Sequence, residues 1–356
     1  MIERERFGVH PSGREVDAIR FVNASGVAVR FLTYGGIIQS VLVPDRHGTP
    51  GDVVLGFDTF EPYLHNPFYF GALIGRSGNR IAHGRFTLHG REYSLTTNDG
   101  AHHLHGGAKG FHQALWDVEV VQRGADLIAV LTYTSAAGDD GYPGNLATHV
   151  TYTLSRDNRF TIDYRATTDA PTPVNLTQHS YFNLTCQPES TVLDQILTIN
   201  ASRYTPVDST LIPLGAHDVV EGTPFDFRLA TPIGRNIHAH DKQLAIASGY
   251  DHNFVLDHTT AGVLGPAARL SDPDSGRLVE LRTTEPGLQV YAGGTFTPGL
   301  VGKGGVTYPR FGGVALETQH YPDAPNHPSF PSTILRPNVE YRSTTEWRFL
   351  TESAPA

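Results

Sequence analysis

Hydrophobic and polar residues alternate with a period of two along much of the chain, whereas the 3.6-residue period of an amphipathic helix is scarce. The clearest example is VTYTL at 150–154 and FTIDY at 160–164, which are separated by the polar turn sequence SRDNR. Alternation on both sides of a short polar turn is typical of an antiparallel hairpin. We therefore expect two paired strands here.

The same pattern recurs at 86–95 around His89-Gly90, at 118–131 around Arg-Gly-Ala-Asp, and at 339–349 near the end of the chain. Glycine and proline supply 37 and 24 of the 356 residues, which points to many turns between ordered strands. Many short strands separated by turn residues indicate an all-β protein, with an antiparallel sandwich or barrel as the two candidate architectures.

The stretch 204–232 is rich in proline and could mark a boundary between two domains. It nevertheless retains Leu211, Ile212, Phe225 and Phe227, which are suited to burial. A long loop that wraps over a sheet explains this better than a linker does. We expect one catalytic domain, residues 1–356.

The amino-acid composition limits which cellular compartment and which binding partners are expected. Lys and Arg number 27 against 36 Asp and Glu, a formal charge of −9, so we expect no basic surface for nucleic acid. The single cysteine, Cys186, rules out an internal disulfide and suits a reducing compartment. The N-terminus MIERERFGVH lacks the apolar stretch of a signal peptide, and no run approaches the roughly 18 apolar residues of a membrane span. We expect a cytoplasmic protein without a membrane partner.

Chemistry is concentrated in five segments that combine dense polar groups with aromatic residues or glycines. They are GRSGNRIAHG (75–84), HHLHGGAKGF (102–111), NLTQHSYFNL (175–184), GYDHNFVL (249–256) and ALETQHYPDAPNHP (315–328). None matches a phosphate-binding loop or the Gly-x-Ser-x-Gly turn of a serine hydrolase.

Two residues in these segments are suited to acid–base chemistry. His179 lies in an unusually polar decapeptide, and an imidazole titrates near neutral pH. Glu317 follows the apolar run Val-Ala-Leu, so we expect it at a strand end that faces a cleft. The structural alternatives are a hydrogen-bonded core histidine and an ion-paired surface glutamate.

Five further residues could bind a polar ligand, and each also has a structural alternative. Asn79 and Arg80 lie in a glycine-rich turn, where the arginine could instead pair with a nearby acid. His105 precedes two glycines and could be a turn histidine, Asp251 could cap a turn, and Gln289 could belong to an ordinary polar strand face. Planar donors and acceptors with one acid, one base and aromatic rings are what a sugar site needs.

A metal site is the competing use of the 18 histidines. His103 and His105 could share one strand face and chelate a metal ion. Such a site normally adds a carboxylate a few residues later, but Lys109 follows instead and its charge opposes a bound cation. The sequence therefore predicts no metal ligands.

Taken together, the segments resemble the aldose 1-epimerases, the galactose mutarotase family. GNRIAHGRF, LHGG, NLTQHSYFNL, DHNF, PGLQVY and LETQHYPDAP occur in the family's order across nearly the whole chain. The resemblance implies a large antiparallel β-sandwich, a small-molecule aldose such as D-glucose or D-galactose as substrate, and no cofactor. One departure is Gly294 in the sequence after PGLQVY, where many relatives carry asparagine.

The resemblance also implies roles. Glu317 would be the general base and His179 the general acid, while Asn79, Arg80, His105, Asp251 and Gln289 would hold the sugar. Opening a hemiacetal ring requires a proton to leave O1 and another to reach O5, and no change of oxidation state occurs. We expect Glu317 to be ionised while His179 is protonated, and hence a bell-shaped pH profile.

Other functions stay open at this level. A glycoside hydrolase would use Glu317 and Asp251 as its two carboxylates. A sugar-binding sandwich would bind without turnover, and an epimerase of phosphorylated sugars would need an added basic cluster. Neither the preferred aldose nor the choice between monomer and homodimer follows from the sequence.

Overall fold

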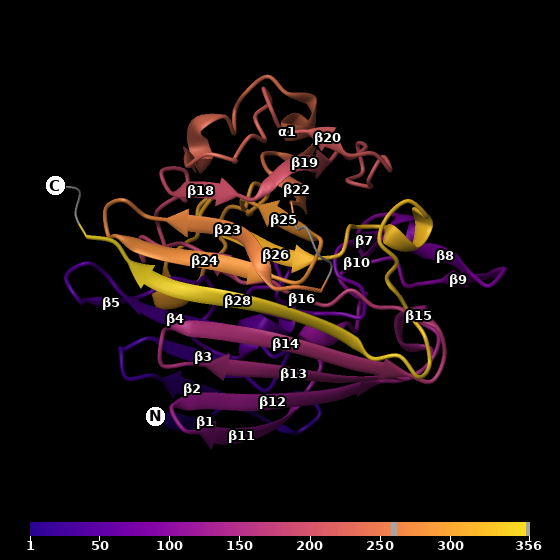
Figure 1. Cartoon of the computed structure of the whole chain (residues 1–356). Helices are drawn as coiled ribbons and strands as arrows, with labels where there is room; N and C mark the ends of the chain where they lie inside the picture. The colour runs from indigo at the N-terminus through magenta and orange to yellow at the C-terminus, as the bar shows by residue number, and fades with distance from the viewer. Residues whose placement is uncertain (258–261, 354–356) are drawn as a thin grey trace.

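Three antiparallel sheets contain most of the strands in the computed structural model, which describes residues 1–257 and 262–353. The largest sheet has nine strands and crosses the front of the molecule, with the C-terminal strand β28 at its centre (Figure 1). In spatial order it contains β11 (Asp117–Arg123), β12 (Asp126–Ser135), β13 (Leu146–Leu154), β14 (Arg159–Thr168), β28 (Tyr341–Thr351), β24 (Arg277–Thr283), β23 (Gly265–Ser271), β18 (Ile196–Ile199) and β21 (Thr231–Pro232).

The other two large sheets have six and five strands. The six-stranded sheet contains β17 (Tyr181–Phe182), β26 (Val314–Gln319), β25 (Gly287–Tyr291), β22 (Asp251–Leu256), β19 (Ala201–Thr205) and β20 (Asp218–Val219). The five-stranded sheet contains β1 (Ile2–Val9), β2 (Glu15–Val22), β3 (Ala28–Leu32), β4 (Ile38–Pro44) and β5 (Pro50–Asp52).

Four two-stranded pairs and a few short helices complete the described structure. The pairs are β6 (Leu73–Ile74) with β16 (Thr177–Gln178), β7 (Arg80–Ile81) with β10 (His103–Leu104), β8 (Arg85–Leu88) with β9 (Arg91–Ser94), and β15 (Thr172–Pro173) with β27 (Ile334–Leu335). The helices are α1 (Lys242–Ala247) and the 3₁₀ turns Glu61–His65, Ala82–Gly84, Phe111–Gln113, Asp139–Gly141, Ile233–Arg235, Lys303–Gly305 and Ala324–Asn326. In the described ranges no helix is long and apolar enough to cross a membrane.

The core lies between the nine-stranded sheet and the other two sheets. Tyr152 of β13 packs edge-on against Phe31 of the five-stranded sheet, with ring centroids 5.2 Å apart. Trp347 of β28 packs in the same way against Phe182 of the six-stranded sheet, at 5.0 Å. The sandwich prediction is therefore confirmed, because one sheet covers the inner faces of two others.

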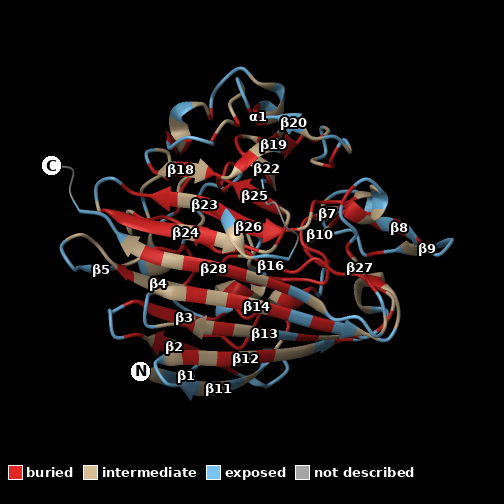
Figure 2. Cartoon of the chain, in the orientation of Figure 1, coloured by how far each residue is buried: buried red, intermediate tan, exposed pale blue. Residues whose placement is uncertain are grey.

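The predicted hairpins are confirmed in register. Val150 pairs with Tyr164 and Leu154 with Phe160, and buried positions alternate with mostly half-buried ones along β12, β13 and β14 (Figure 2). One detail of the prediction is wrong: Val339 precedes β28 and is 54% exposed, since the strand begins only at Tyr341.

The stretch 204–232 adds the short edge strand β20 to the six-stranded sheet and the edge strand β21 to the nine-stranded sheet. Phe225 and Phe227 from this stretch are buried in the core, where Phe225 stacks on Tyr204 at 4.3 Å. The sequence did not predict α1, which follows the stretch. Asp241 caps α1 by accepting hydrogen bonds from the backbone amides of Gln243 and Leu244.

Candidate active site

A row of polar side chains crosses the six-stranded sheet. Glu317 of β26 pairs with Gln289 of β25, Gln289 pairs with Asn253 of β22, and Asn253 pairs with Thr205 of β19. Directly paired residues on adjacent strands point to the same face, so these four side chains lie in one line. Asp251 lies two residues before Asn253 on the same face. The sheet alone therefore brings three of the predicted residues together.

The structure corrects the expected position of Glu317. It lies inside β26, not at the end of the strand, and its residue is 2% exposed. Its neighbours Leu316 and Thr318 face the opposite side, where Leu316 joins the core. The apolar run that suggested a strand before Glu317 is thus the first half of a strand that continues through it.

The polar decapeptide brings His179 to this carboxylate. His179 lies between β16 and β17, and its Nε2 is 3.5 Å from Oε1 of Glu317. Its backbone is fixed because its amide donates to the carbonyl of Ala72 at 2.9 Å. The rings of Tyr69 and Tyr181 lie nearly parallel to the imidazole, with centroids 5.9 and 4.9 Å away.

The two-stranded sheet of β7 and β10 supplies the next three predicted residues. Arg80 in β7 pairs with Leu104 in β10, which places Asn79 beside His105. Asn79 and His105 both have left-handed backbones, with φ of 58° and 51°. The Arg80 Nε donates to Asp99 at 2.8 Å, and its Nη1 lies 4.0 Å from Asp251. The ion pair considered as an alternative role for Arg80 is therefore present, and it forms within the site.

These residues surround a cavity of about 350 Å³. Six of the seven predicted residues line it, namely Asn79, Arg80, His105, His179, Asp251 and Glu317. Gln289 lies behind this lining and donates its Nε2–H to Oδ1 of Asp251 at 2.6 Å. It therefore orients a wall residue, and a direct contact between Gln289 and the ligand stays a prediction.

Burial sets the protonation of the two central groups. Burial raises the pKa of Glu317 well above its usual range, the nearby Asp251 raises it further, and Arg80 partly offsets both. Burial lowers the pKa of His179 to about 3. Both shifts favour the uncharged forms of the two side chains, the opposite of the ion pair that we expected. The uncharged pair and the ion pair nevertheless hold the same single proton.

Asp251 and His105 are also shifted toward their neutral forms. Burial raises the pKa of Asp251, while Arg80 and the hydrogen bond from Gln289 act in the other direction. Burial lowers the pKa of His105 well below its usual range, and the neighbouring His179 and Arg80 lower it further. Of the described residues that line the cavity, Arg80 is therefore the permanent cation.

Among the described residues, one group of side chains has the spacing of metal ligands. His105, His179 and Glu317 each place a ligand atom within 4.8 Å of the others. The chelate that the sequence suggested for His103 and His105 does not form, because His103 faces Thr96 and Tyr142 at 2.7 Å each. His105 reaches this cluster from beyond the end of β10.

Comparison with known proteins decides the family. The aldose 1-epimerase family model matches residues 17–348. The chain is 42% identical to galactose mutarotase of Mus musculus over 348 residues, 98% of each chain, and 38% identical to aldose 1-epimerase of Escherichia coli K12, covering 96% of this chain and 97% of that protein. The crystal structure of galactose 1-epimerase from Lactobacillus acidophilus superimposes with a TM-score of 0.87 at 28% identity, covering 99% of each chain.

This chain belongs to the aldose 1-epimerase family. It is accordingly an isomerase of the epimerase type. The fold that the family resemblance implied is the one observed, with a TM-score of 0.85 to an aldose epimerase homologue from C. elegans.

The local structure of this epimerase explains why Gly294 departs from the family pattern. A Cβ at this position would lie 2.3 Å from the carbonyl oxygen of Ser248, which follows α1. Any side chain would collide with that backbone, so the close approach of α1 to the β25–β26 connection requires glycine here. Ser248 also lines the cavity, beside Ala247 of α1.

The long connection between β25 and β26 forms one wall of the epimerase cavity. Thr295 lines the cavity, with its Oγ1 2.6 Å from the hydroxyl of Tyr291, and Phe296 packs on Phe68 at 4.8 Å. Sequence reasoning missed these residues, as well as Tyr69 and Asp99. The aromatic run NPFYFGAL, residues 66–73, was the available signal for Phe68 and Tyr69.

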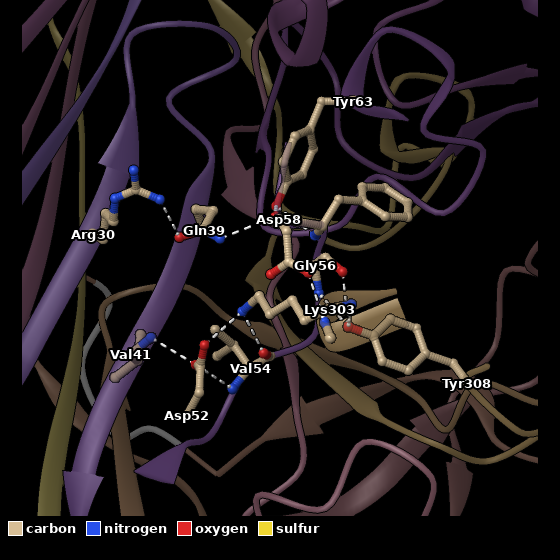
Figure 3. A network of polar contacts seen from close by, with 12 residues as sticks. Arg30, Gln39, Val41, Asp52, Val54, Gly56, Asp58, Tyr63, Lys303 and Tyr308 are labelled. Carbon is tan, nitrogen blue, oxygen red and sulfur yellow. Dashed lines mark hydrogen bonds and ion pairs between the residues drawn. The ribbon is translucent and has the colours of Figure 1, made fainter. Parts of the chain in front are cut away.

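Lys303 anchors the middle of the connection between β25 and β26. Its Nζ donates to Oδ2 of Asp52 at 2.8 Å and to the carbonyl of Val54 at 2.9 Å, and Tyr308 donates to the carbonyl of Gly56 at 2.8 Å (Figure 3). Asp52 also accepts a hydrogen bond from the amide of Val41 in β4. The network therefore ties the wall of the cavity to the five-stranded sheet.

Proposed function

We propose that this epimerase interconverts the α and β anomers of free hexoses such as D-glucose and D-galactose, with Glu317 as general base and His179 as general acid. The observation that carries the assignment is the 3.5 Å contact between Oε1 of Glu317 and Nε2 of His179, made inside a cavity that holds both groups. A base and an acid this close can serve O1 and O5 of one pyranose.

The first step opens the ring. Glu317 takes the proton of the anomeric hydroxyl, the C1–O5 bond breaks, and His179 gives its proton to O5. The free aldehyde then rotates about C1–C2. Closure reverses the two transfers on the other face of the carbonyl. Each positioned proton transfer typically contributes roughly 10²–10⁴-fold to the rate.

The charged form of the pair must be reached from the uncharged form that burial favours. Moving one proton from Glu317 to His179 converts one into the other without changing the net charge of the site. Arg80 stabilises the resulting carboxylate, and the imidazolium at 3.5 Å attracts it. A sugar hydroxyl that hydrogen-bonds to Glu317 favours the same form.

The surrounding groups suit a neutral sugar. A cavity of about 350 Å³ falls within the range for small-molecule sites, and Tyr69 and Phe68 offer aromatic surface beside the polar groups. Among the described lining residues, three acidic side chains (Asp99, Asp251 and Glu317) accompany the single basic side chain Arg80, which already pairs with Asp99. This balance disfavours a phosphorylated sugar, which would require additional cations.

Polarimetry on freshly dissolved α-D-glucose and α-D-galactose tests the proposal. The protein should speed the approach to the equilibrium rotation, and Glu317→Gln should abolish most of the acceleration. Binding of galactose without acceleration would instead indicate a sugar-binding module. Release of reducing ends from a disaccharide would indicate a hydrolase using Glu317 and Asp251.

Compartment and assembly are part of the proposal. We place the enzyme in the cytoplasm as a monomer or homodimer, without nucleic-acid or membrane partners. The net charge of −9 and the lone Cys186, whose pKa is raised by burial to about 12, support this placement. Light scattering coupled to size-exclusion chromatography measures the mass of the assembly, and cell fractionation locates it.

A further inference from the structure

Asn175 begins the polar decapeptide that carries His179, and it is 1% exposed. Its Oδ1 accepts a hydrogen bond from the backbone amide of His320 at 2.9 Å, and its Nδ2 donates to the carbonyl oxygens of His320 and Gly78 at 3.3 Å each. The side chain therefore uses its acceptor and both donors on the backbone of two other segments. An exchange of the amide oxygen and nitrogen would set like groups against all three partners, so the orientation of the amide is fixed.

The side chain of Asn175 takes the place of a strand partner for His320. β26 ends at Gln319, so His320 is the first residue beyond the strand. The amide of Asn175 presents an acceptor to the N–H of His320 and a donor to its C=O, as a neighbouring antiparallel strand would. It thereby fixes the chain three residues after Glu317.

The backbone of Asn175 is paired with residues 76–82, here called the Arg80 segment. Its amide donates to the carbonyl of Arg76 at 2.9 Å, and its carbonyl accepts from the amide of Gly78 at 2.7 Å. The side chain bonds to the Gly78 carbonyl as well, so Asn175 holds both backbone polar groups of the residue before Asn79. Asn175 therefore connects the Arg80 segment to the continuation of β26.

The residues after β26 contact the Arg80 segment a second time. The backbone amide of Asp323 donates to the carbonyl of Arg80 at 2.8 Å, and its Oδ1 accepts from the amide of Ala82 at 2.9 Å. These contacts and those of Asn175 hold the segment on both sides of Arg80. Asn175 differs from Asp323 because it also belongs to the decapeptide that carries His179.

We propose that Asn175 is a positioning residue of the epimerase reaction, which fixes the Arg80 segment against the strand of Glu317 and so sets how closely the Arg80 cation approaches the general base. The proposal rests on the proposed function, because it takes Glu317 as the base. It requires no contact between Asn175 and the sugar, since the described lining of the cavity does not include Asn175.

Arg80 acts on the base through its charge. Its Nη1 lies 4.0 Å from Asp251, and it lowers the pKa of Glu317 against the effects of burial and Asp251, which raise it. The interaction of two charges weakens as their distance grows, and least solvent screens it in a buried site. A displacement of the Arg80 segment by about 1 Å would therefore change the base, and a misplacement of this size can cost about 10²-fold in rate.

The other groups near the base carry less charge than Arg80. Among the described residues, the titratable groups near Glu317 are His105, His179, Tyr181 and Asp251. Burial shifts the pKa of each toward its neutral form. Arg80 is therefore the charged group whose approach to Glu317 depends on the position of the Arg80 segment.

Asn175→Ala tests the proposal, with Asn183→Ala as the matched control. Asn183 lies near the other end of the decapeptide and is 2% exposed, and its amide bonds to residues outside the described cavity lining, namely Thr185, Ser190, Gln195 and Gly312. Both variants leave buried polar groups without partners and should lower the free energy of unfolding. For the folded protein, we expect Asn175→Ala to lower kcat by roughly 10–10²-fold and Asn183→Ala to leave it nearly unchanged.

Asn175→Asp is a near-isosteric second variant. Its carboxylate keeps the acceptor for the His320 amide but sets an oxygen against the carbonyls of His320 and Gly78. A proton on this carboxyl restores one donor. We expect its kcat relative to the wild type to rise at least about threefold from about pH 8 to about pH 5. The same relative kcat as Asn175→Ala at both pH values would overturn the proposal.

Carboxyl ¹³C NMR of the free protein separates the proposal from the proposed function. We expect the titration midpoint of Glu317 to move to higher pH in Asn175→Ala, because Arg80 approaches it less closely, and to keep its wild-type value in Asn183→Ala. An unmoved midpoint in folded Asn175→Ala would overturn the proposal, as would a kcat within about threefold of the control. Absence of mutarotation in the wild type would instead remove the proposed function, while the NMR result would still decide the role of Asn175.

Discussion

Oε1 of Glu317 lies 3.5 Å from Nε2 of His179, and the two side chains are 2% and 4% exposed. β17 pairs directly with β26, so the decapeptide and the carboxylate strand are held together by the sheet itself. The distance between the acid and the base is therefore set by backbone pairing, and a bound sugar meets a site that is already assembled.

Substitution of either member of the pair should remove most of the activity. We expect Glu317→Gln and His179→Gln each to lower kcat by roughly 10²–10⁴-fold, because each removes one proton transfer. The kcat of the double variant should be little lower than that of either single variant, because the two proton transfers work together and the loss of one already removes most of the benefit of the other. NMR exchange between the α and β anomers of galactose measures these rates.

Exposed residues of the same type provide the controls for this pair. Glu119→Gln in β11 and His149→Asn in β13 alter exposed strand positions far from the cavity and should leave the rate unchanged. Glu317→Gln activity within about tenfold of these controls would contradict the assignment.

The pH profile should report the single proton held by the pair. Activity is lost at low pH when a second proton is added, which the His179 pKa of about 3 places in the acid range. Activity is lost at high pH when the last proton leaves, which the raised Glu317 pKa moves upward from its usual value. We expect a broad plateau between these limbs in kcat/KM. A basic limb that persists unchanged in Glu317→Gln would contradict this origin.

The sequence alone predicted the strand pattern well because period-two alternation is a local property. The hairpin of β13 and β14 is an example, since its turn and its apolar positions are read from fifteen consecutive residues. The single-domain organisation stays a prediction. The short helix α1 could not be predicted, because six residues carry too little periodicity and the Asp241 cap became informative only in its structural setting.

The site was predicted less evenly than the fold. The identities of Glu317 and His179 came from the sequence motifs. Their 3.5 Å contact depends on the pairing of β17 with β26, two strands that are more than a hundred residues apart in the sequence. Gln289 alternates on β25 as expected, yet whether it touches a ligand or Asp251 depends on side-chain direction. Tyr69 was missed because its role comes from packing against His179 and His105, which lie far from it in the sequence.

Removal of the Gln289 amide should weaken substrate binding. Its Nε2–H stabilises the anionic form of Asp251, so Gln289→Leu should raise the Asp251 pKa further and leave a wall carboxyl less well oriented. We expect KM for galactose to rise about tenfold, in line with a hydrogen bond to a charged group, with a smaller change in kcat.

The matched control for Gln289 is Gln319→Leu on β26. Gln319 is also fully buried, and neither of its amide atoms has a hydrogen-bond partner among the described residues. An equal rise in KM in both variants would show a general packing effect in place of the Asp251 contact.

The Lys303 anchor should contribute to stability and to the shape of the cavity wall. Lys303→Met removes the hydrogen bonds to Asp52 and Val54 and leaves a partly buried carboxylate without its cation. We expect a loss of about 1–3 kcal/mol in the free energy of unfolding, measured by urea denaturation, together with a higher KM. Lys242→Met at an exposed position is the control, and an equal effect there would contradict the anchoring role.

A buried ion pair at the end of β26 should make stability depend on pH. His320 contacts Glu285, which also accepts a hydrogen bond from Tyr341 at 3.0 Å. Burial alone would lower the His320 pKa, but Glu285 raises it overall. Burial alone would raise the Glu285 pKa, but the charge of His320 and the hydrogen bonds that Glu285 accepts lower it overall.

The two shifts define the pH window of this stabilisation. A raised His320 pKa stabilises the fold below its ordinary value of 6.5, and the gain is lost as the pH rises through the folded pKa. A lowered Glu285 pKa stabilises the fold above its ordinary value of 4.5, and that gain is lost as the pH falls. Glu285→Gln should therefore cost about 3 kcal/mol near pH 6 and clearly less near pH 9, measured by urea denaturation. An equal cost at both pH values would show that Glu285 acts through packing and hydrogen bonds, without the charge of His320.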